Sequence, residues 1–564
     1  MAGNLGQPIV ILSDDVERSS GSDALDRNIA AAKAVGETVR STLGPISLDK
    51  MIVDSRGDVV VTNDGSTVLQ TVEVESPAAR MMVEVAQTME VAVGDGTTSA
   101  AVFAGELLSC ARDLLDQGIH SANIVKGYHL AARKAVDLLE SLSEPIGSGD
   151  DDLRKVALTG MNSKGSATVR ELLADVCVKA VRRVEKDGVV DVDTDVHILN
   201  ADGVSVEDTH LVDGVAIFSK RADEDMPRRL EDARIALVDD VEPKELGTKM
   251  GTLNIGPKLK FEINSSEKLQ EFSDAKKKPL FDIIDRVSEL GVNVVLCKKG
   301  LTEEVVYEFA KRGVFAVKIA SEEEVKVVGR ATGARLIPHA ERLTEDDLGH
   351  AGLVEERGEK DKEIVYFEQC KNPNTVSIVT TGRADTSNMG DTIVGALHVL
   401  KDVMEDDGVV PGGGAIEVEL AGKIREYAPS ISGREHLAVQ VFADALESIP
   451  RAIAQNAGLD ELDLLITLRA EHKAGHSKAG IDVTGDGVVE NITDHGVIDP
   501  VKVKKQSIKS GVETANMLLR IDDVIASKIV APPSEDVKAP GDLGPDEGYY
   551  NTCSPPKPPR RLDY

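Results

Sequence analysis

The sequence predicts a multidomain α+β protein in which both ends of the chain form one mostly helical domain. The chain has 564 residues, which is too long for one hydrophobic core, so two to four domains are expected. Long Ala- and Leu-rich helical patterns of the same texture occur before about residue 145 and after about residue 400. Between them, short β-rich runs alternate with helical patterns, which is typical of an α/β module. We therefore expect the other domains to be inserted between two halves of a helical one.

The N-terminal third is expected to be helical with one hairpin. Apolar residues recur at helical spacing in Asn28–Thr42, and Gly44-Pro45 ends that helix. The runs Lys50–Asp54 and Val59–Thr62 predict two strands joined by a turn. Three aliphatic helices are expected to follow: Ala78–Glu90, Thr97–Gln117 and Ser121–Leu142.

The middle of the chain is expected to be mixed. A polar segment, Gly147–Asp152, marks the end of the first helical part, and a helix is expected at Thr168–Lys186. An irregular insertion, Asp239–Lys278, interrupts the α/β module. The module's expected strands are Ile235–Val238, Val292–Leu296 and Phe315–Ile319, and its helices are Lys278–Leu290 and Thr302–Arg312. Helices return at Gly414–Leu468, and Pro532–Tyr564 has the composition of a disordered tail.

Composition narrows the class of protein. With 41% hydrophobic and 29% charged residues the chain is a folded, soluble protein, and its net charge of −32 disfavours nucleic acid and anionic membrane as partners. The five cysteines show no zinc-binding spacing, and free thiols suit a reducing compartment. We find neither a signal-peptide pattern nor an apolar stretch of membrane-spanning length, so a cytoplasmic location is expected.

One glycine-rich segment has the groups that a phosphate site needs. In Gly94-Asp95-Gly96-Thr97-Thr98-Ser99, glycines precede a helix whose first amides can face an anion, three hydroxyls follow, and Asp95 offers an oxygen ligand for Mg²⁺. The alternative is an ordinary capped helix after a glycine turn. Likewise, Thr62-Asn63-Asp64-Gly65 is either a site segment or a tight turn. A third glycine segment, Pro411–Gly414, opens another helix, and the chain has no P-loop motif.

Taken together, these segments resemble the group II chaperonins, the archaeal thermosome and its eukaryotic cytosolic relative. The resemblance runs from about residue 24 to 530. Its most specific segments are ETVRSTLGP (37–45), VGDGTTSAAVFAGELL (93–108), VVPGGGAIEVELA (409–421) and NAGLD (456–460).

The resemblance implies three domains and a ring. A helical equatorial domain would comprise 1–146 and 403–530, and a small mixed intermediate hinge domain would comprise 147–214 and 369–402. An α/β apical domain, 215–368, would bind unfolded proteins and carry a helical lid protrusion at about 239–280; residues 531–564 remain the tail. Identical or paralogous subunits would form two stacked rings of eight or nine members, a symmetry that the sequence leaves open.

The resemblance also implies a site for ATP and Mg²⁺, with K⁺ as a further candidate. Asp95 would hold Mg²⁺, Asp64 would orient water and cations, and Lys164 lies in a loop that senses the terminal phosphate. Asp499 would bind the ribose, and Gly413 and Gly414 would contact the ribose or base. The remaining expected contacts to the nucleotide and its phosphates are Leu43, Gly44, Pro45, Gly94, Gly96, Thr97, Thr98 and Ser99.

One position departs from the family pattern. The second catalytic Asp of the family lies sixteen residues before the Pro of the glycine motif, where this chain has Gly395. Asp391, one helical turn earlier, is a candidate substitute acting through a water, although a solvated carboxylate is the favoured interpretation. The sequence thus supports an ATP-driven folding machine or, alternatively, an ATP-binding but poorly hydrolysing structural subunit of a mixed ring. A small-molecule kinase using the same segments would form no ring.

Overall fold

A computed structural model describes residues 16–527, except for 54–56, 73, 148, 162–165, 203–204, 242–279, 320, 359–362, 373, 383–385, 407 and 486. The chain divides into two units, of which the smaller takes residues up to Ala24 and from Asp522. In that unit β1 (Val16–Ser20) pairs antiparallel with β19 (Asp523–Ser527), and Arg18 forms an ion pair with Asp523 at 2.6 Å. The predicted tail at 531–564 and nearly all of the predicted lid at 239–280 lie outside the described residues.

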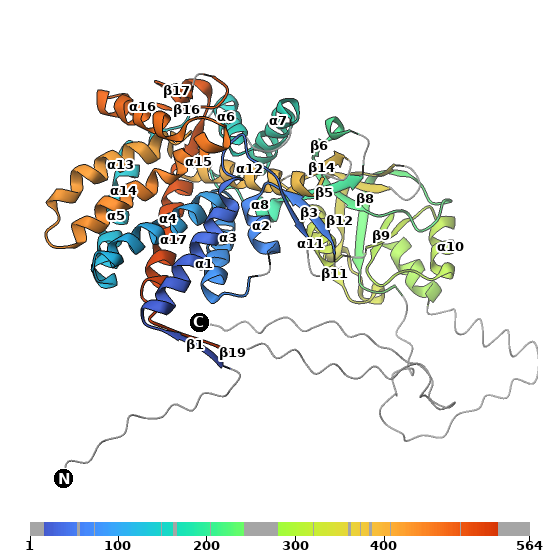
Figure 1. Cartoon of the computed structure of the whole chain (residues 1–564). Coiled ribbons are helices and arrows are strands. Elements are labelled where there is room, and N and C mark those ends of the chain that lie inside the picture. The colour runs from blue at the N-terminus through green and yellow to red at the C-terminus, as the bar shows by residue number, and fades with distance from the viewer. Residues whose placement is uncertain are drawn as a thin grey trace, which may run out of the picture. The chain divides into compact units, whose positions relative to one another are not determined.

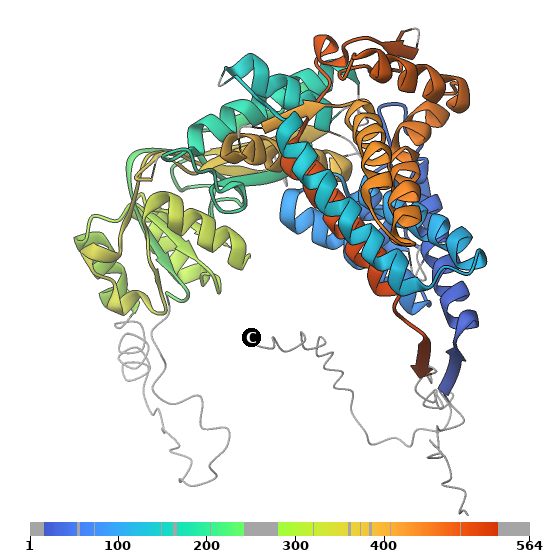
Figure 2. The same ribbon diagram turned by 90° about the vertical axis from the view of Figure 1, so that its left-hand side faces the viewer.

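In the larger unit, Leu25–Ile521, one hydrophobic core combines helices from far apart in the sequence. The core is aliphatic as expected, and its few rings include Phe103 edge-on to Phe442, with centroids 5.4 Å apart. Figure 2 shows the cyan helix α5 running beside the red-orange α17. The helices of this core are α1 (Ser22–Arg40), α2 (Gly65–Thr71), α3 (Pro77–Val93), α4 (Thr97–Asp116), α5 (Ser121–Leu142), α13 (Ala415–Tyr427), α14 (Glu435–Leu446) and α17 (Val501–Leu518).

A second core forms around the long helix α12 (Thr386–Asp406). It packs α12 against α6 (Asp150–Gly160) and α7 (Ala167–Val184), beside the three-stranded sheet β5–β14–β6. These strands are β5 (Val196–Asp202), β6 (His210–Val212) and β14 (Val376–Gly382), and the short helix α8 (Val192–Asp195) precedes β5.

The α/β module is a seven-stranded sheet buried on both faces, in the order β10-β9-β8-β12-β13-β7 with β11 also paired to β8. Figure 1 labels β8, β9, β11 and β12 of this sheet. Successive residues of β8 alternate between two cores, Ile235 and Leu237 on one face and Ala236 and Val238 on the other. Helix α11 covers the first face, while α10 and the helical residues 280–289 cover the second. The elements are β7 (Gly214–Phe218), β8 (Arg229–Val238), β9 (Val294–Cys297), α10 (Glu303–Lys311), β10 (Phe315–Lys318), α11 (Glu322–Thr332), β11 (Leu336–Ile337), β12 (Gly349–Arg357) and β13 (Ile364–Cys370).

The remaining elements are short or connect the cores. Two small sheets, β18–β15–β4 and β16–β17, and the hairpin β2–β3 complete the strands. Their bounds are β2 (Lys50–Val53), β3 (Val59–Thr62), β4 (Glu144–Pro145), β15 (Gly408–Pro411), β16 (Gly480–Asp482), β17 (Gly487–Val489) and β18 (Ile498–Pro500). No helix of the described residues is long and apolar enough to cross a membrane.

The elements predicted from sequence patterns are confirmed, with three differences. The expected helical stretch 414–468 is four α-helices, α13, α14, α15 (Ser448–Asn456) and α16 (Glu461–Ala474), interrupted by turns at glycines such as Gly433 and Gly458. The polar segment Gly147–Asp152 overlaps a helix, because Asp150–Asp152 form the first turn of α6, where carboxylates suit the helix dipole. The interpretation of Asn63–Gly65 as a turn alone is wrong, because helix α2 begins at Gly65.

Candidate functional site

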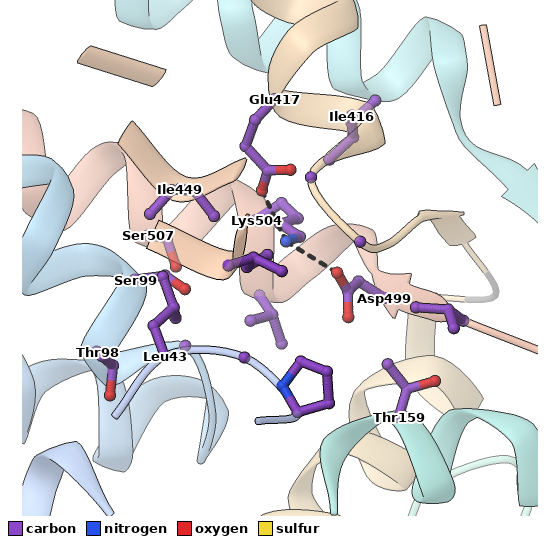
Figure 3. Close-up of a pocket in the computed structure, with 18 of the residues that line it drawn as sticks. Leu43, Thr98, Ser99, Thr159, Ile416, Glu417, Ile449, Asp499, Lys504 and Ser507 are labelled. Carbon is purple, nitrogen blue, oxygen red and sulfur yellow. Dashed lines mark hydrogen bonds and ion pairs between the residues drawn. The ribbon is translucent and has the colours of Figure 1, made fainter. Parts of the chain in front are cut away.

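A cavity of about 430 Å³ in the larger unit collects most of the residues predicted to form the site (Figure 3). Its lining includes every predicted residue of the segments 43–45, 95–99 and 413–414, together with Asp64 and Asp499. Further walls come from residues 159–160, 446–453 and 481–508. Segments separated by hundreds of residues therefore meet around one cavity.

The loop before α4 presents an uncapped helix end to the cavity. Gly94 and Gly96 have positive φ angles of 65° and 75°, so each can end or begin a helix where a side chain would be strained. Gly96 is the N-cap residue of α4, and no described side chain caps the helix. Asp95 instead accepts a hydrogen bond from the Gly96 amide at 2.6 Å. The alternative of an Asp or Thr cap is therefore not realised, and the residues Thr97, Thr98 and Ser99 line the cavity.

A distant asparagine holds the segment Leu43–Pro45 against the cavity. The Asn456 side-chain amide, at the end of α15, donates to the carbonyl oxygens of Arg40 at 2.9 Å and Leu43 at 2.7 Å. It thereby supplies hydrogen bonds to carbonyl groups at and just after the C-terminal end of α1, where helical partners are lacking. The same helix α15 contributes Ile449 and Ile453 to the apolar wall.

The glycine pair before α13 fits where no side chain would. Gly413 and Gly414 have φ angles of 59° and 79°, and the Gly413 carbonyl accepts from the Ile481 amide at 2.9 Å. A Cβ atom on Gly414 would lie 2.7 Å from the Pro450 Cβ, which is closer than real contacts allow. Backbone therefore forms this wall of the cavity.

Gly414→Ala is expected to lower the free energy of unfolding by about 1–3 kcal/mol, since the left-handed conformation and the clash with Pro450 are both unfavourable. Urea unfolding followed by circular dichroism measures it. Gly422→Ala on the same helix is the matched control: its Cβ would meet nothing within 4 Å and its φ is helical, so it should be neutral or stabilise by up to about 1 kcal/mol. Equal losses in both variants would contradict the steric reading of Gly414.

Asp64 has a structural role and lines the cavity as well. Its Oδ2 accepts from the Thr67 amide at 2.9 Å and from the Ser66 hydroxyl at 2.6 Å, so it caps α2. The cap fixes the direction of the carboxylate at the cavity wall. Asp64 can therefore cap α2 and serve as a site residue from the same position.

Three charged residues meet across the cavity wall, and only one of them was predicted. Lys504 Nζ on α17 donates to Glu417 Oε1 at 2.7 Å and forms an ion pair with Asp499 Oδ2 at 2.8 Å (Figure 3). Burial by itself lowers the pKa of Lys504, but the two carboxylates outweigh burial and raise it above its ordinary value. The ammonium therefore stays protonated throughout the physiological range.

Four predicted residues do not line the cavity. Lys164 lies outside the described residues, directly after the helix α6 that brings Thr159 and Gly160 to the cavity. Gly94, Gly395 and Asp391 are described but are not lining residues. Gly395, on α12, faces the loop before α4: a Cβ built on it would lie 3.4 Å from the Gly94 carbonyl oxygen and meet nothing else within 4 Å. Asp391 is exposed.

Sequence patterns missed Glu417, Lys504 and Ser507, which all line the cavity. An acidic residue in the apolar start of α13 was a usable signal for Glu417. Lys504 is one of four lysines between 502 and 509, and nothing in that run distinguishes the buried one. Ser507 follows Lys504 by one helical turn, and its hydroxyl has no hydrogen-bond partner among the described residues.

The combination suits a nucleoside phosphate with a divalent cation. Helix-end amides and hydroxyls suit phosphate oxygens, isoleucines suit a flat apolar ring, and Asp499 and Glu417 accept hydrogen bonds from donors. Across the described residues, no group of three or more His, Cys, Asp or Glu side chains converges on a metal position. Mg²⁺ commonly takes one or two carboxylates together with phosphate oxygens, so Asp95 fits that role. The fold is that of a multidomain α+β protein, and the lining of its cavity suits a nucleotide.

The family follows from comparison with known proteins. The family model of the TCP-1/cpn60 chaperonins matches residues 35–529. The thermosome subunit of Methanopyrus kandleri is 44% identical over 94% of this chain and 96% of its own length, and that of Methanocaldococcus jannaschii is 43% identical over 96% and 99%. The thermosome subunit beta of Archaeoglobus fulgidus is 44% identical over 94% and 96%. The chain belongs to the TCP-1/cpn60 chaperonin family and is a subunit of the group II, thermosome type.

Proposed function

We propose that this chain is a chaperonin subunit that binds Mg·ATP in the 430 Å³ cavity and uses it to fold unfolded proteins inside a double ring. The observation that carries the proposal is the meeting of the glycine, hydroxyl and carboxylate segments around that one cavity. Family membership supports the ATP-dependent chaperonin activity.

Each group of lining residues has a role in this proposal. The amides and hydroxyls at the start of α4 bind phosphate oxygens, and Asp95 holds Mg²⁺, which would neutralise phosphate charge. Asp64 orients water and a cation, Mg²⁺ or K⁺, at the terminal phosphate. Lys164, directly after α6, senses that phosphate, and Gly94 supports the loop. Asp499 accepts from the ribose, beside the backbone of Gly413 and Gly414.

We expect this chain to bind ATP but to hydrolyse it slowly. Gly395 has no side chain at the position of the second catalytic carboxylate, and Asp391 is exposed and away from the lining. Without a general base, hydrolysis is expected to be slow. The glycine at position 395 also supports a second candidate function. In that case the chain would be an ATP-binding structural subunit in a ring where paralogous subunits hydrolyse ATP.

We further propose an equatorial domain of 1–146 and 403–530, an intermediate domain of 147–214 and 369–402, and an apical domain of 215–368. The core that joins α3 and α4 to α13 and α17 supports the first, and the core around α12 supports the second. The seven-stranded sheet supports an apical module for unfolded proteins, with a lid at about 239–280. A cytoplasmic subunit without nucleic-acid or membrane partners is consistent with the strongly acidic chain.

The hairpin β2–β3 is the surface that we propose for contact with a neighbouring subunit. Its strands pair Met51 with Val61 and Val53 with Val59, so these four exposed apolar side chains share one face. Met51 is 72% exposed. A contiguous apolar face on a two-stranded sheet is unstable alone and typical of an interaction site.

Met51→Asp with Val59→Asp is therefore expected to shift the assembly toward single subunits, because two charges would be buried in the contact. Sedimentation velocity measures the shift. The control is Leu462→Asp with Ile466→Asp, which changes exposed apolar residues on α16. An intact ring in the hairpin variant would refute this contact.

ATP titration calorimetry with and without Mg²⁺, followed by a steady-state ATPase assay on the purified full chain, tests the central proposal. Micromolar binding that requires Mg²⁺ is expected, with turnover far below that of an ordinary thermosome. No ATP binding at millimolar concentration would overturn the proposal. Turnover equal to that of an ordinary thermosome would exclude the structural-subunit alternative.

A further inference from the structure

The contact of Lys504 with two carboxylates brings together elements that are distant in the sequence. Lys504 lies in the first turn of α17, Glu417 in the first turn of α13, and Asp499 on β18. All three line the cavity (Figure 3). One ammonium therefore fixes two carboxylates that would otherwise repel each other at this wall.

Glu417 has a second oxygen that the protein leaves unused. Its side chain is 8% exposed, and Oε1 is taken by Lys504, whereas Oε2 has no hydrogen-bond partner among the residues that the structure describes. Burying an unpartnered carboxylate oxygen is unfavourable, and an ionised carboxylate can only accept hydrogen bonds. Because Glu417 also lines the cavity, this oxygen is an acceptor available to a donor of a bound ligand.

Charge balance supports the same conclusion. Two carboxylates and one ammonium leave about one negative charge at this wall, and the lining beside them includes the apolar side chain of Ile416 and the neutral hydroxyl-bearing side chain of Ser507. That wall does not suit phosphate. It suits the neutral part of a nucleotide, whose donors are the ribose hydroxyls and the amino group of the base.

We propose that Glu417 is a second nucleoside-binding acceptor beside Asp499, and that Lys504 is the positioning residue that holds both carboxylates toward the nucleoside. This inference rests on the proposed ATP site and extends it, because it assigns roles to two residues outside the glycine and Asp499 segments. The donor that Glu417 receives is a ribose hydroxyl or the 6-amino group of adenine.

Glu417→Gln tests the acceptor, because it keeps the shape and removes the charge. Calorimetry with the full chain and Mg·ATP is expected to show affinity lowered roughly 10- to 100-fold, the range for a hydrogen bond to a charged group. Titrations with 2′-deoxy-ATP, 3′-deoxy-ATP and purine riboside triphosphate, which lacks the 6-amino group, identify the donor. The wild type should discriminate against the analogue that lacks that donor, and the variant should not. Unchanged ATP affinity together with unchanged discrimination would overturn the proposal.

Lys504→Met tests the positioning role. It is expected to weaken ATP binding, and the double variant with Glu417→Gln should lose less affinity than the two single losses combined, because both act on one contact. Additive losses in the double variant, together with wild-type discrimination between the analogues in the Lys504→Met single variant, would show a purely structural lysine and overturn that role.

Lys502→Met is the matched control. Lys502 lies on the same helix and also binds two carboxylates, Asp402 at 2.6 Å and Glu405 at 3.2 Å, but it does not line the cavity. It should lower the thermal unfolding temperature and leave ATP affinity unchanged. If wild-type protein fails to bind ATP, the proposed function fails; if it binds ATP and the Glu417 and Lys504 variants bind equally well, only this inference fails.

Discussion

Gly395→Asp is expected to raise ATP turnover roughly 10²- to 10⁴-fold, the usual contribution of a general base. The substitution restores a carboxylate on α12 opposite the loop that starts α4. Space is available, because a Cβ at this position makes one ordinary contact, with the Gly94 carbonyl oxygen at 3.4 Å. The backbone is helical, so no strain opposes a side chain. Phosphate release at saturating Mg·ATP measures the gain.

Gly395→Ala separates the carboxylate from the other effects of replacing glycine. Alanine gains about 1 kcal/mol of helix preference over glycine and aspartate only about 0.3 kcal/mol, while both variants make the same Cβ contact. Alanine should leave turnover at the wild-type level, and equal turnover in the two variants would contradict a catalytic position at 395. Asp391→Asn in the wild type is expected to change little; a large loss would instead identify Asp391 as the working substitute.

Glu447→Gln is expected to lower the free energy of unfolding by about 3 kcal/mol, the lower end of the range for breaking a buried ion pair. Glu447 is fully buried between α14 and α15, and each of its oxygens accepts from both Arg425 and Arg469. The two arginine side chains are 31% and 42% exposed. Solvent can therefore hydrate their charges in the variant, which limits the loss of stability. Urea unfolding at neutral pH measures the change.

The pH dependence and a neighbouring residue provide controls. Burial alone would raise the pKa of Glu447, but hydrogen bonds from the two guanidinium groups outweigh it and lower the pKa. The stabilisation is therefore present above pH 4.5, the ordinary glutamate value, and lost as the pH falls below it. The difference in unfolding free energy between wild type and variant should therefore narrow in acid.

The control variant, Asp444→Asn, removes another partner of Arg425, but that carboxylate is 51% exposed and should contribute less than about 1 kcal/mol. Equal losses would contradict the importance of burial.

Local patterns predicted several of the long helices, five of the strands and part of the site. Gly96 and Gly414 have positive φ angles and directly precede α4 and α13, whose apolar spacing is clear. The starts of these two helices and the loops before them were therefore predictable. The strand runs in β8, β9 and β10 were recognisable because both faces are buried, which makes them continuously apolar, whereas β7, β11, β12 and β13 were not predicted individually. Asp64 was assigned to the site while its seven-residue helix was missed, since so short a helix after Asn-Asp-Gly resembles a turn.

Residues whose role depends on distant partners were not predictable in this way. Lys504 is distinguished from its neighbours only by Glu417, 87 positions away, and by the cavity that both line. Asn456 was part of a recognised segment, but its hold on the Leu43 carbonyl spans 413 positions. The roles of Lys164 and Gly395, the domain boundaries and the lid remain predictions.

The separation of Leu43 and Asn456 along the chain has a consequence for folding during synthesis. During synthesis, Leu43–Pro45 and the start of α4 leave the ribosome hundreds of residues before Asn456 and Lys504. The early segments must wait with their apolar helix faces uncovered, which is the condition under which large chains aggregate. Nucleotide can stabilise only the finished chain, because its walls do not exist earlier. Under the proposed function, a subunit that helps other proteins to fold would thus itself pass through a long, unliganded and aggregation-prone stage, which ends only when α17 has been synthesised.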